Sequence, residues 1–95
     1  MSDKLMHRFE AHVNLVNEFK YNDASKSIPS DILLELYGLY KQATIGDVAT
    51  DRPSMFYYIE RSKWDAWDKQ SGLTKESAMK LYIKTIKQTN KSYTQ

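Results

Sequence analysis

The sequence predicts an all-α fold, a bundle of four helices. Apolar residues recur every three to four positions in four segments of the chain, which is the period of one face of an α-helix. Short polar stretches with Pro, Gly, Asn or Ser separate the segments. The alternation that marks β-strands does not persist beyond a few residues. Helices that each carry one apolar face bury those faces against one another, so we expect a bundle.

The first helix is predicted over residues 3–20, where no Gly or Pro interrupts the pattern. His12 lies on or near the apolar stripe, and we expect a half-buried side chain bonded to a neighbour rather than to a ligand. His7 and His12 are five positions apart, which is not the i, i+3 or i+4 spacing of helical metal ligands. We therefore expect no metal site. The apolar stripe comprises Leu5, Phe9, His12, Val13, Val16 and Phe19.

A polar connection over residues 21–29 leads to the second helix, predicted from about Asp31 to Ile45. Pro29 directs the residue before it away from helical angles. Ser30 would then be the N-cap, because its side chain can accept a hydrogen bond from the first turn. Gly46 would end the helix, since glycine adopts the left-handed conformation without steric cost.

After a loop over residues 46–54, the third helix is predicted from about Glu60 to Gln70. Trp64 and Trp67 are three positions apart and should face the same way. The apolar run from Met55 to Ile59 could begin this helix or form an extended segment packed on the bundle. Most of the aromatic residues are expected in the core, since they offer the largest apolar surfaces.

The fourth helix should begin after Gly72, with Thr74 as its cap and Glu76 in its first turn. A row of lysines follows the opposite side of this helix, at Lys80, Lys84, Lys87 and Lys91. We expect that row to be a solvated face rather than a membrane or nucleic-acid patch. The apolar face comprises Ala78, Leu81, Tyr82, Thr85, Ile86, Thr89 and Tyr93.

Length and composition restrict the function further. A chain of 95 residues fits a single domain over residues 1–95. Its net charge of +2, from 14 basic and 12 acidic residues, is too balanced to indicate nucleic-acid binding. No cysteine is present, which excludes disulfides and thiolate metal sites. We expect no membrane span and no secretory signal, because long uninterrupted apolar runs are missing, and a cytoplasmic location.

The clearest candidate site lies on the second helix, where Tyr37, Tyr40 and Lys41 fall within one turn. An apolar stripe that includes Leu33 and Leu36 runs beside them. Phenols and an ammonium group next to apolar surface suit a ligand that is part anion and part hydrocarbon. A simpler alternative is that each tyrosine keeps its hydroxyl wet at the core margin and that the lysine covers apolar surface.

Catalytic signatures are missing from the sequence. It contains no glycine-rich phosphate loop, no zinc spacing and no nucleophile elbow. Asp65 and Asp68 are expected to be solvated carboxylates rather than an acid–base pair. We therefore expect no catalytic residues, no metal, no cofactor and no enzyme activity.

Several ordered motifs resemble the acyl-CoA-binding protein family. The resemblance covers the chain from Phe9 to Ile86, and its parts follow one another in the family's order. It implies an antiparallel four-helix bundle with up-down-down-up connections, which binds medium- and long-chain fatty acyl-CoA without catalysis. The motifs are Leu36-Tyr37-Gly38-Leu39-Tyr40-Lys41-Gln42-Ala43-Thr44-Ile45-Gly46-Asp47, then Arg52-Pro53, Lys63-Trp64-Asp65-Ala66-Trp67, Gly72, Ala78-Met79 and Tyr82-Ile83.

The resemblance also implies roles for individual residues. Tyr37, Lys41 and Lys63 match positions that hold the adenosine 3′-phosphate, and phosphate favours lysine charge and phenolic donors. Tyr40 matches the tyrosine that lines the adenine site, and Tyr82 matches one that closes on the ligand. Two leucines match positions that touch the acyl chain, namely Leu33 and Leu34. Packing of the first helix on the fourth would fall to Phe9, Val13, Val16, Ile83 and Ile86.

The sequence departs from the family pattern in two places. Asn17 stands where family members often carry a lysine near the phosphates, although Lys20 lies one turn later. The connection over residues 20–29 is longer than in compact members. The expected function is a monomeric intracellular carrier and pool former for acyl-CoA, with acyl-CoA-using enzymes as further candidate partners. The alternative is a helical protein-interaction module that has kept the fold without the ligand.

Overall fold

The computed structural model describes residues 3–21 and 28–93, of which the side chains at 19–21 and 90–93 are left aside. The expected side-chain positions of Lys20, Lys91 and Tyr93, and most of the connection at 20–29, lie outside the described part. Four helices follow one another along the chain: α1 (Asp3–Tyr21), α2 (Ser30–Thr44), α3 (Tyr58–Asp68) and α4 (Lys75–Tyr93). No strand occurs in the described ranges, which confirms the all-α prediction.

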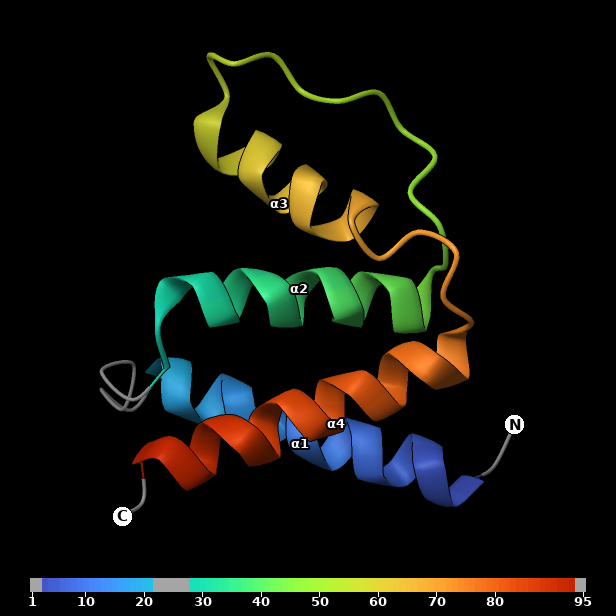
Figure 1. Cartoon of the computed structure of the whole chain (residues 1–95), viewed down its shortest axis with the longest axis vertical. Helices are drawn as coiled ribbons and strands as arrows, with labels where there is room; N and C mark the ends of the chain where they lie inside the picture. Colours follow the sequence, from blue (N-terminus) through green and yellow to red (C-terminus); the bar gives the residue numbers. More distant parts are fainter. Residues whose placement is uncertain (1–2, 22–27, 94–95) are drawn as a thin grey trace.

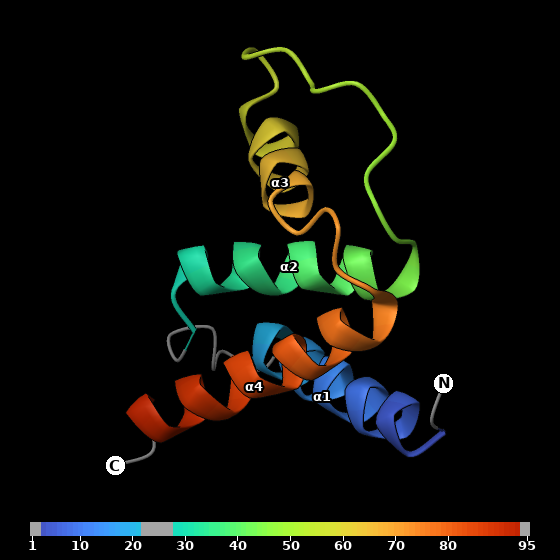
Figure 2. The same cartoon turned by 45° about the vertical axis from the view of Figure 1, so that its right-hand side comes forward.

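The helix α2 lies in the middle of the molecule, with α3 on one side and the pair α1 and α4 on the other (Figure 1). Seen in that view, α1 and α4 run in one direction and α2 and α3 in the other, which is the up-down-down-up order. The rotated view keeps α3 apart from α1 and α4 (Figure 2). The helix α2 is therefore the element that joins the other parts of the bundle.

The hydrophobic core lies between α1, α2 and α4. Phe9 on α1, Leu39 on α2 and Met79 on α4 are each only 2% exposed. By contrast, α3 contributes no fully buried residue, so its position cannot depend on deep apolar burial. Leu81, expected on the apolar face of α4, lies at its margin and is 37% exposed. The core cluster is Leu5, Phe9, Val16, Leu36, Leu39, Ala43, Ala78, Met79, Tyr82, Ile83 and Ile86.

Of the four predicted helix ends, those at Gly46 and Thr74 are as expected, whereas α3 ends at Asp68 and not at Gly72. Gly46 and Gly72 have φ angles of 105° and 97°, the left-handed region that glycine tolerates. Thr74 caps α4, because its Oγ1 accepts a hydrogen bond of 3.0 Å from the N–H of Ser77. The prediction of Ser30 as a cap was wrong. The helix α2 already includes Ser30, its N-cap is Pro29, and no side chain caps it.

The apolar run before α3 does not pack on the bundle. Met55, Phe56 and Tyr57 precede the helix and are 70%, 91% and 63% exposed. Tyr58 and Ile59 open the helix and are 77% and 64% exposed. The helix therefore begins within this run, at Tyr58 and not at Ser54. The alternative of an extended segment packed on the bundle was wrong, and so was the assignment of these aromatics to the core. Burial of an aromatic side chain requires a surface to cover it, and no described element lies over this segment.

Candidate functional site

A cavity of about 440 Å³ is lined by side chains from all four helices. Such a volume lies within the range of about 300–1,000 Å³ that is typical of small-molecule sites. Residues from α2 make up half of the lining, and α3 and α4 contribute one side chain each. The lining comprises Val13, Val16, Asn17, Leu33, Leu34, Leu36, Tyr37, Tyr40, Lys63 and Tyr82.

The lining changes character along α2. Leu33 and Leu34 lie near the beginning of the helix, and Tyr37 and Tyr40 follow one and two turns later. At a rise of 1.5 Å per residue, Leu33 and Tyr40 are about 10 Å apart along the axis. The α2 side of the cavity thus changes from aliphatic carbon to phenols, and Asn17 and Lys63 add an amide and an ammonium group to the lining. This arrangement suits an amphipathic ligand rather than a purely polar one.

Phe9 holds two of the phenol rings in place. Its ring meets Tyr82 edge to face, with centroids 5.1 Å apart, and stacks on Tyr40 at 6.1 Å. Tyr82 is only 3% exposed. Burial, with a smaller contribution from Tyr40, raises the pKa of Tyr82 to about 12. Its hydroxyl therefore stays protonated at neutral pH and remains a hydrogen-bond donor.

Two lysines converge on the ring of Tyr37. The Nζ of Lys41 lies 5.9 Å from the ring centroid and that of Lys63 lies 5.5 Å from it. Lys41 also lies 5.1 Å from the Trp67 ring, so aromatic faces flank its ammonium group. Lys63 and Tyr37 line the cavity, whereas Lys41 lies outside the lining. Two cations beside one phenol form a place where a phosphate could accept charge-assisted hydrogen bonds.

The polar anchors of α3 decide where Lys63 lies, because this helix buries no residue fully. The indole N–H of Trp67 donates to the carbonyl of Gly46 at 2.7 Å, and that of Trp64 donates to Thr50 at 3.0 Å. Both tryptophans thus bond the loop that precedes their own helix. These bonds fix the rotation of α3 about its axis, and with it the direction of Lys63, which lies one turn before Trp67.

An ion pair adds to these anchors. The guanidinium of Arg52 donates two hydrogen bonds of 2.8 Å to the carboxylate of Asp65. The hydrogen bond raises the pKa of Arg52 and lowers the pKa of Asp65. Asp65, expected as a solvated carboxylate, is thus the ionised partner of Arg52.

Gly38 explains how α3 approaches α2 so closely. A Cβ atom at this position would overlap the carbonyl oxygen of Ala66 and lie 2.6 Å from its carbonyl carbon. It would also lie 3.1 Å from the backbone nitrogen of Trp67. Only glycine leaves room for the α3 backbone at this crossing. The crossing holds Lys63 against the edge of α2 that carries Tyr37 and Lys41.

Gln42 and Asp47 join the loops at the far end of α2. Gln42 is fully buried, and its amide donates to Asp47 at 2.7 Å and to the carbonyl of Leu73 at 2.8 Å. Asp47 also accepts a bond of 2.8 Å from the N–H of Gly72. That backbone bond, and then the bond from Gln42, lower the pKa of Asp47. The loops on both sides of α3 are thereby connected to α2.

Within the described ranges, no cluster of His, Cys, Asp or Glu could hold a metal ion, and no helix there is long and apolar enough to cross a membrane. His12 is half-buried, and its Nδ1 lies 2.7 Å from the carbonyl oxygen of Arg8. This neighbour contact is the interpretation favoured from the sequence.

Comparison with known proteins identifies the family. A family model described as "Acyl CoA binding protein" matches residues 6–86. The chain belongs to the acyl-CoA-binding protein family. An acyl-CoA-binding protein of Gossypium hirsutum is 46% identical over 88 residues, with 88% of this chain and 89% of the relative covered.

Solved structures agree with this family assignment. Oryza sativa acyl-CoA-binding protein 2 is similar at a TM-score of 0.77 and 39% identity, with 95% of this chain and 94% of that chain covered. The ACBP of Moniliophthora perniciosa is similar at a TM-score of 0.78 and 29% identity, with 100% and 86% covered. The up-down-down-up bundle is therefore shared with other members of this family.

Six of the seven binding residues expected from the family resemblance line one cavity, and Lys41 lies beside it. Four lining residues were not expected at the site. Val13 and Val16 were assigned only to packing between α1 and α4, and Asn17 was noted only as a departure from the family. Their helical spacing on α1 was visible in the sequence, but the partner across the cavity was not. The fourth unexpected lining residue is Leu36.

Proposed function

We propose that this chain binds medium- and long-chain fatty acyl-CoA in the cavity between the four helices and carries it without chemical change. The observation that supports this most strongly is the lining of that cavity, which pairs aliphatic side chains with phenols and the ammonium group of Lys63. Membership of a family of binding proteins supports the same ligand class. A ligand with a phosphorylated nucleotide at one end and an alkyl chain at the other contacts both the polar and the aliphatic side chains of this lining.

The proposal assigns each part of the ligand to residues of the site. Tyr37, Lys41 and Lys63 hold the 3′-phosphate, where two ammonium groups approach one phenol. Tyr40 lies against the adenine ring, and Tyr82 donates its hydroxyl to the bound ligand. The acyl chain lies against aliphatic carbon, at about 0.8 kcal/mol for each buried methylene. The residues proposed for that contact are Leu33 and Leu34.

Asn17 lines the cavity without a charge. In the proposal, two lysines, one on α2 and one on α3, neutralise the charge of the 3′-phosphate. The position of Asn17 on α1 contributes no positive charge. We propose a single domain over residues 1–95 that acts as a cytoplasmic monomer and delivers acyl-CoA to enzymes that use it. Size-exclusion chromatography with light scattering tests the monomer, and incubation with acyl-CoA tests for any hydrolysis.

Calorimetric titration tests the ligand class. A long-chain acyl-CoA should bind far more tightly than either CoA or the free fatty acid, because each fragment uses only one part of the cavity. Equal affinity for the free acid and its CoA ester would remove the basis of the proposal.

One observation favours the second candidate, a protein-interaction module. The segment from Met55 to Ile59 presents consecutive large apolar side chains that are all at least 63% exposed, and such surfaces often mark contact sites. The same titration separates the two, because a chain that has lost the ligand would bind neither acyl-CoA nor CoA. Replacing Phe56 with serine should leave acyl-CoA affinity unchanged, since this side chain is not in the cavity lining.

A further inference from the structure

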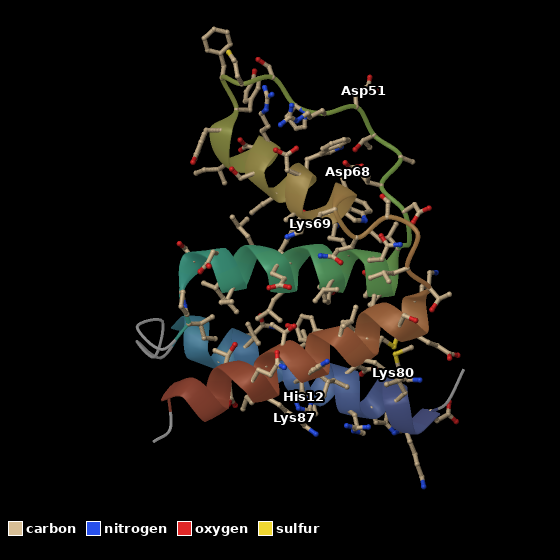
Figure 3. All side chains as sticks on the ribbon, in the orientation of Figure 1. His12, Asp51, Asp68, Lys69, Lys80 and Lys87 are labelled. Atoms are coloured by element: carbon tan, nitrogen blue, oxygen red, sulfur yellow. The ribbon has the colours of Figure 1, made fainter. Side chains whose placement is uncertain are left out.

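A second pocket, of about 360 Å³, lies between α1 and α4 and combines four cationic side chains with an apolar floor. Arg8 comes from α1, and the lysines of the row on α4 come from the other side. Figure 3 shows Lys80 and Lys87 on the α1 and α4 side of the molecule, away from α2 and α3. The lining of this basic pocket is Arg8, Lys80, Ile83, Lys84, Lys87 and Gln88.

The described lysines of the row are exposed, as expected for a solvated face, but they also line a pocket. Arg8, from a different helix, joins the row, and the surface between them is hollowed rather than convex. Ile83 is only 4% exposed, so it closes the bottom of the hollow. The three lysines are exposed. In the part of the chain that the structure describes, none of these cations forms an ion pair, and no carboxylate lines the pocket.

The basic pocket is also separate from the acyl-CoA cavity. Lys80 and Lys84 each lie two positions from Tyr82, which is about 200° around the helix axis. Tyr82 lines the cavity and the lysines line the pocket, so α4 presents opposite faces to the two. A ligand in one does not share side chains with a ligand in the other.

Charge and dimensions indicate the class of ligand. From Lys80 to Lys87 the row rises about 10 Å, which is too long for one phosphate to span. Two phosphate monoesters carry together about −3 to −4 at neutral pH, which matches four cations. The acidic residue nearest along this row is Glu76, one turn before Lys80 and outside the lining.

We propose that the basic pocket binds a compact ligand with at least two phosphate monoesters on a carbon ring, in which Arg8 and the lysines hold the phosphates and Ile83 meets the ring. A phosphorylated inositol has this chemistry, whether it is free in solution or the headgroup of a lipid. This inference does not depend on the proposed acyl-CoA binding, because the two sites share no residue.

The test titrates inositol 1,4,5-trisphosphate into the isotope-labelled chain and follows the backbone amide resonances. Saturable shifts are expected at Arg8, Ile83 and Lys84, and not at Tyr37 or Lys63. The variant K80Q/K84Q should weaken binding by about tenfold or more, since each charge-assisted bond is worth about 1.5–3 kcal/mol. The matched control K69Q/K75Q removes the same charge from exposed positions outside the pocket lining and should change affinity by less than about twofold.

Several results would overturn the proposal: no saturation, shifts centred on Tyr37 and Lys63, or an equal loss in the control variant. Equally tight binding of a polyglutamate peptide would also overturn it, since the pocket would then recognise negative charge alone. Vesicles distinguish the two sources of the ligand. If the chain sediments with phosphatidylcholine vesicles that contain phosphatidylinositol bisphosphate, the ligand is a lipid headgroup. If it binds the soluble inositol phosphate but does not sediment with these vesicles, the ligand is a free one. Equal sedimentation with phosphatidylserine vesicles of the same charge counts against the proposal.

Discussion

Replacing Lys41 with alanine should weaken acyl-CoA binding and leave the fold intact. A charge-assisted hydrogen bond is worth about 1.5–3 kcal/mol, so loss of the ammonium group should reduce affinity by about 10- to 100-fold. Besides the packing of its half-buried stem, the fold loses two aromatic contacts of the ammonium group, at 5.1 Å and 5.9 Å. At about 0.5–1 kcal/mol each, their loss is small against the stability of a typical domain, about 5–15 kcal/mol.

The assay is a double-mutant cycle with two ligands. Calorimetry measures the affinity of both chains for a long-chain acyl-CoA and for the matching acyl-dephospho-CoA, which lacks the 3′-phosphate. If Lys41 contacts that phosphate, the substitution should hardly change the affinity for the dephospho ligand. The coupling free energy of the cycle should then approach the free energy lost when Lys41→Ala binds the intact ligand. Lys63 also approaches Tyr37, so it can compensate and lower the coupling.

Lys4→Ala serves as the control for general charge. Lys4 is exposed on the first turn of α1, and the first α1 residue in the cavity lining is Val13, about 13 Å further along the axis. The control should bind both ligands as the parent chain does. Equal weakening of both ligands by Lys41→Ala would refute the 3′-phosphate contact, and urea-induced unfolding at a much lower midpoint would show that the lysine is structural.

Three further predictions concern the supports of the site. Gly38→Ala should destabilise the fold by about 1–3 kcal/mol in urea unfolding and weaken acyl-CoA binding, because the new methyl group meets the Ala66 backbone; a gain of about 1 kcal/mol, as helix propensity alone gives, would contradict this. The lowered pKa of Asp47 means that its stabilising contribution is complete above the ordinary value of 3.8 and is lost as the pH falls through the lower folded value. Asp47→Asn should therefore show a smaller loss of stability between about pH 5 and about pH 2 than the parent, and identical curves would reject the assignment. Tryptophan emission should change on acyl-CoA binding, with the response lost in Trp67→Phe and kept in Trp64→Phe, because Lys41 lies against the Trp67 ring; flat emission at saturating ligand would exclude such a sensor.

The helices and their glycine and threonine ends could be predicted because their signals are local. The spacing of apolar residues sets each helix, and Gly46 and Thr74 act through their own backbone or side-chain chemistry. Ser30 failed as a cap although its residue type is favourable, because the helix already begins at that residue. The segment from Met55 to Ile59 failed for a different reason. Apolar composition indicates a preference for burial, but only the tertiary arrangement decides whether a surface is available.

Most of the residues that gather around the cavity were predicted from the sequence, but the contacts that hold them in place were not. Motifs on α2 and α3 named the residues that the bundle gathers around the cavity. Gly38 in the middle of a helix gave a visible signal, since glycine is unfavourable there, but its reason is the backbone of Ala66 on another helix. The burial of Gln42 and its bonds to Asp47 and Leu73 likewise join segments far apart in sequence. Pairings of this kind cannot be deduced from periodicity.

A crystal structure of the chain with a bound sixteen-carbon acyl-CoA would test the central proposal most directly. The account predicts the acyl chain against Leu33 and Leu34, the adenine against Tyr40, and oxygens of the 3′-phosphate within about 3 Å of Lys41 or Lys63. A ligand seated in the pocket between α1 and α4, or one whose 3′-phosphate contacts neither lysine, would contradict it.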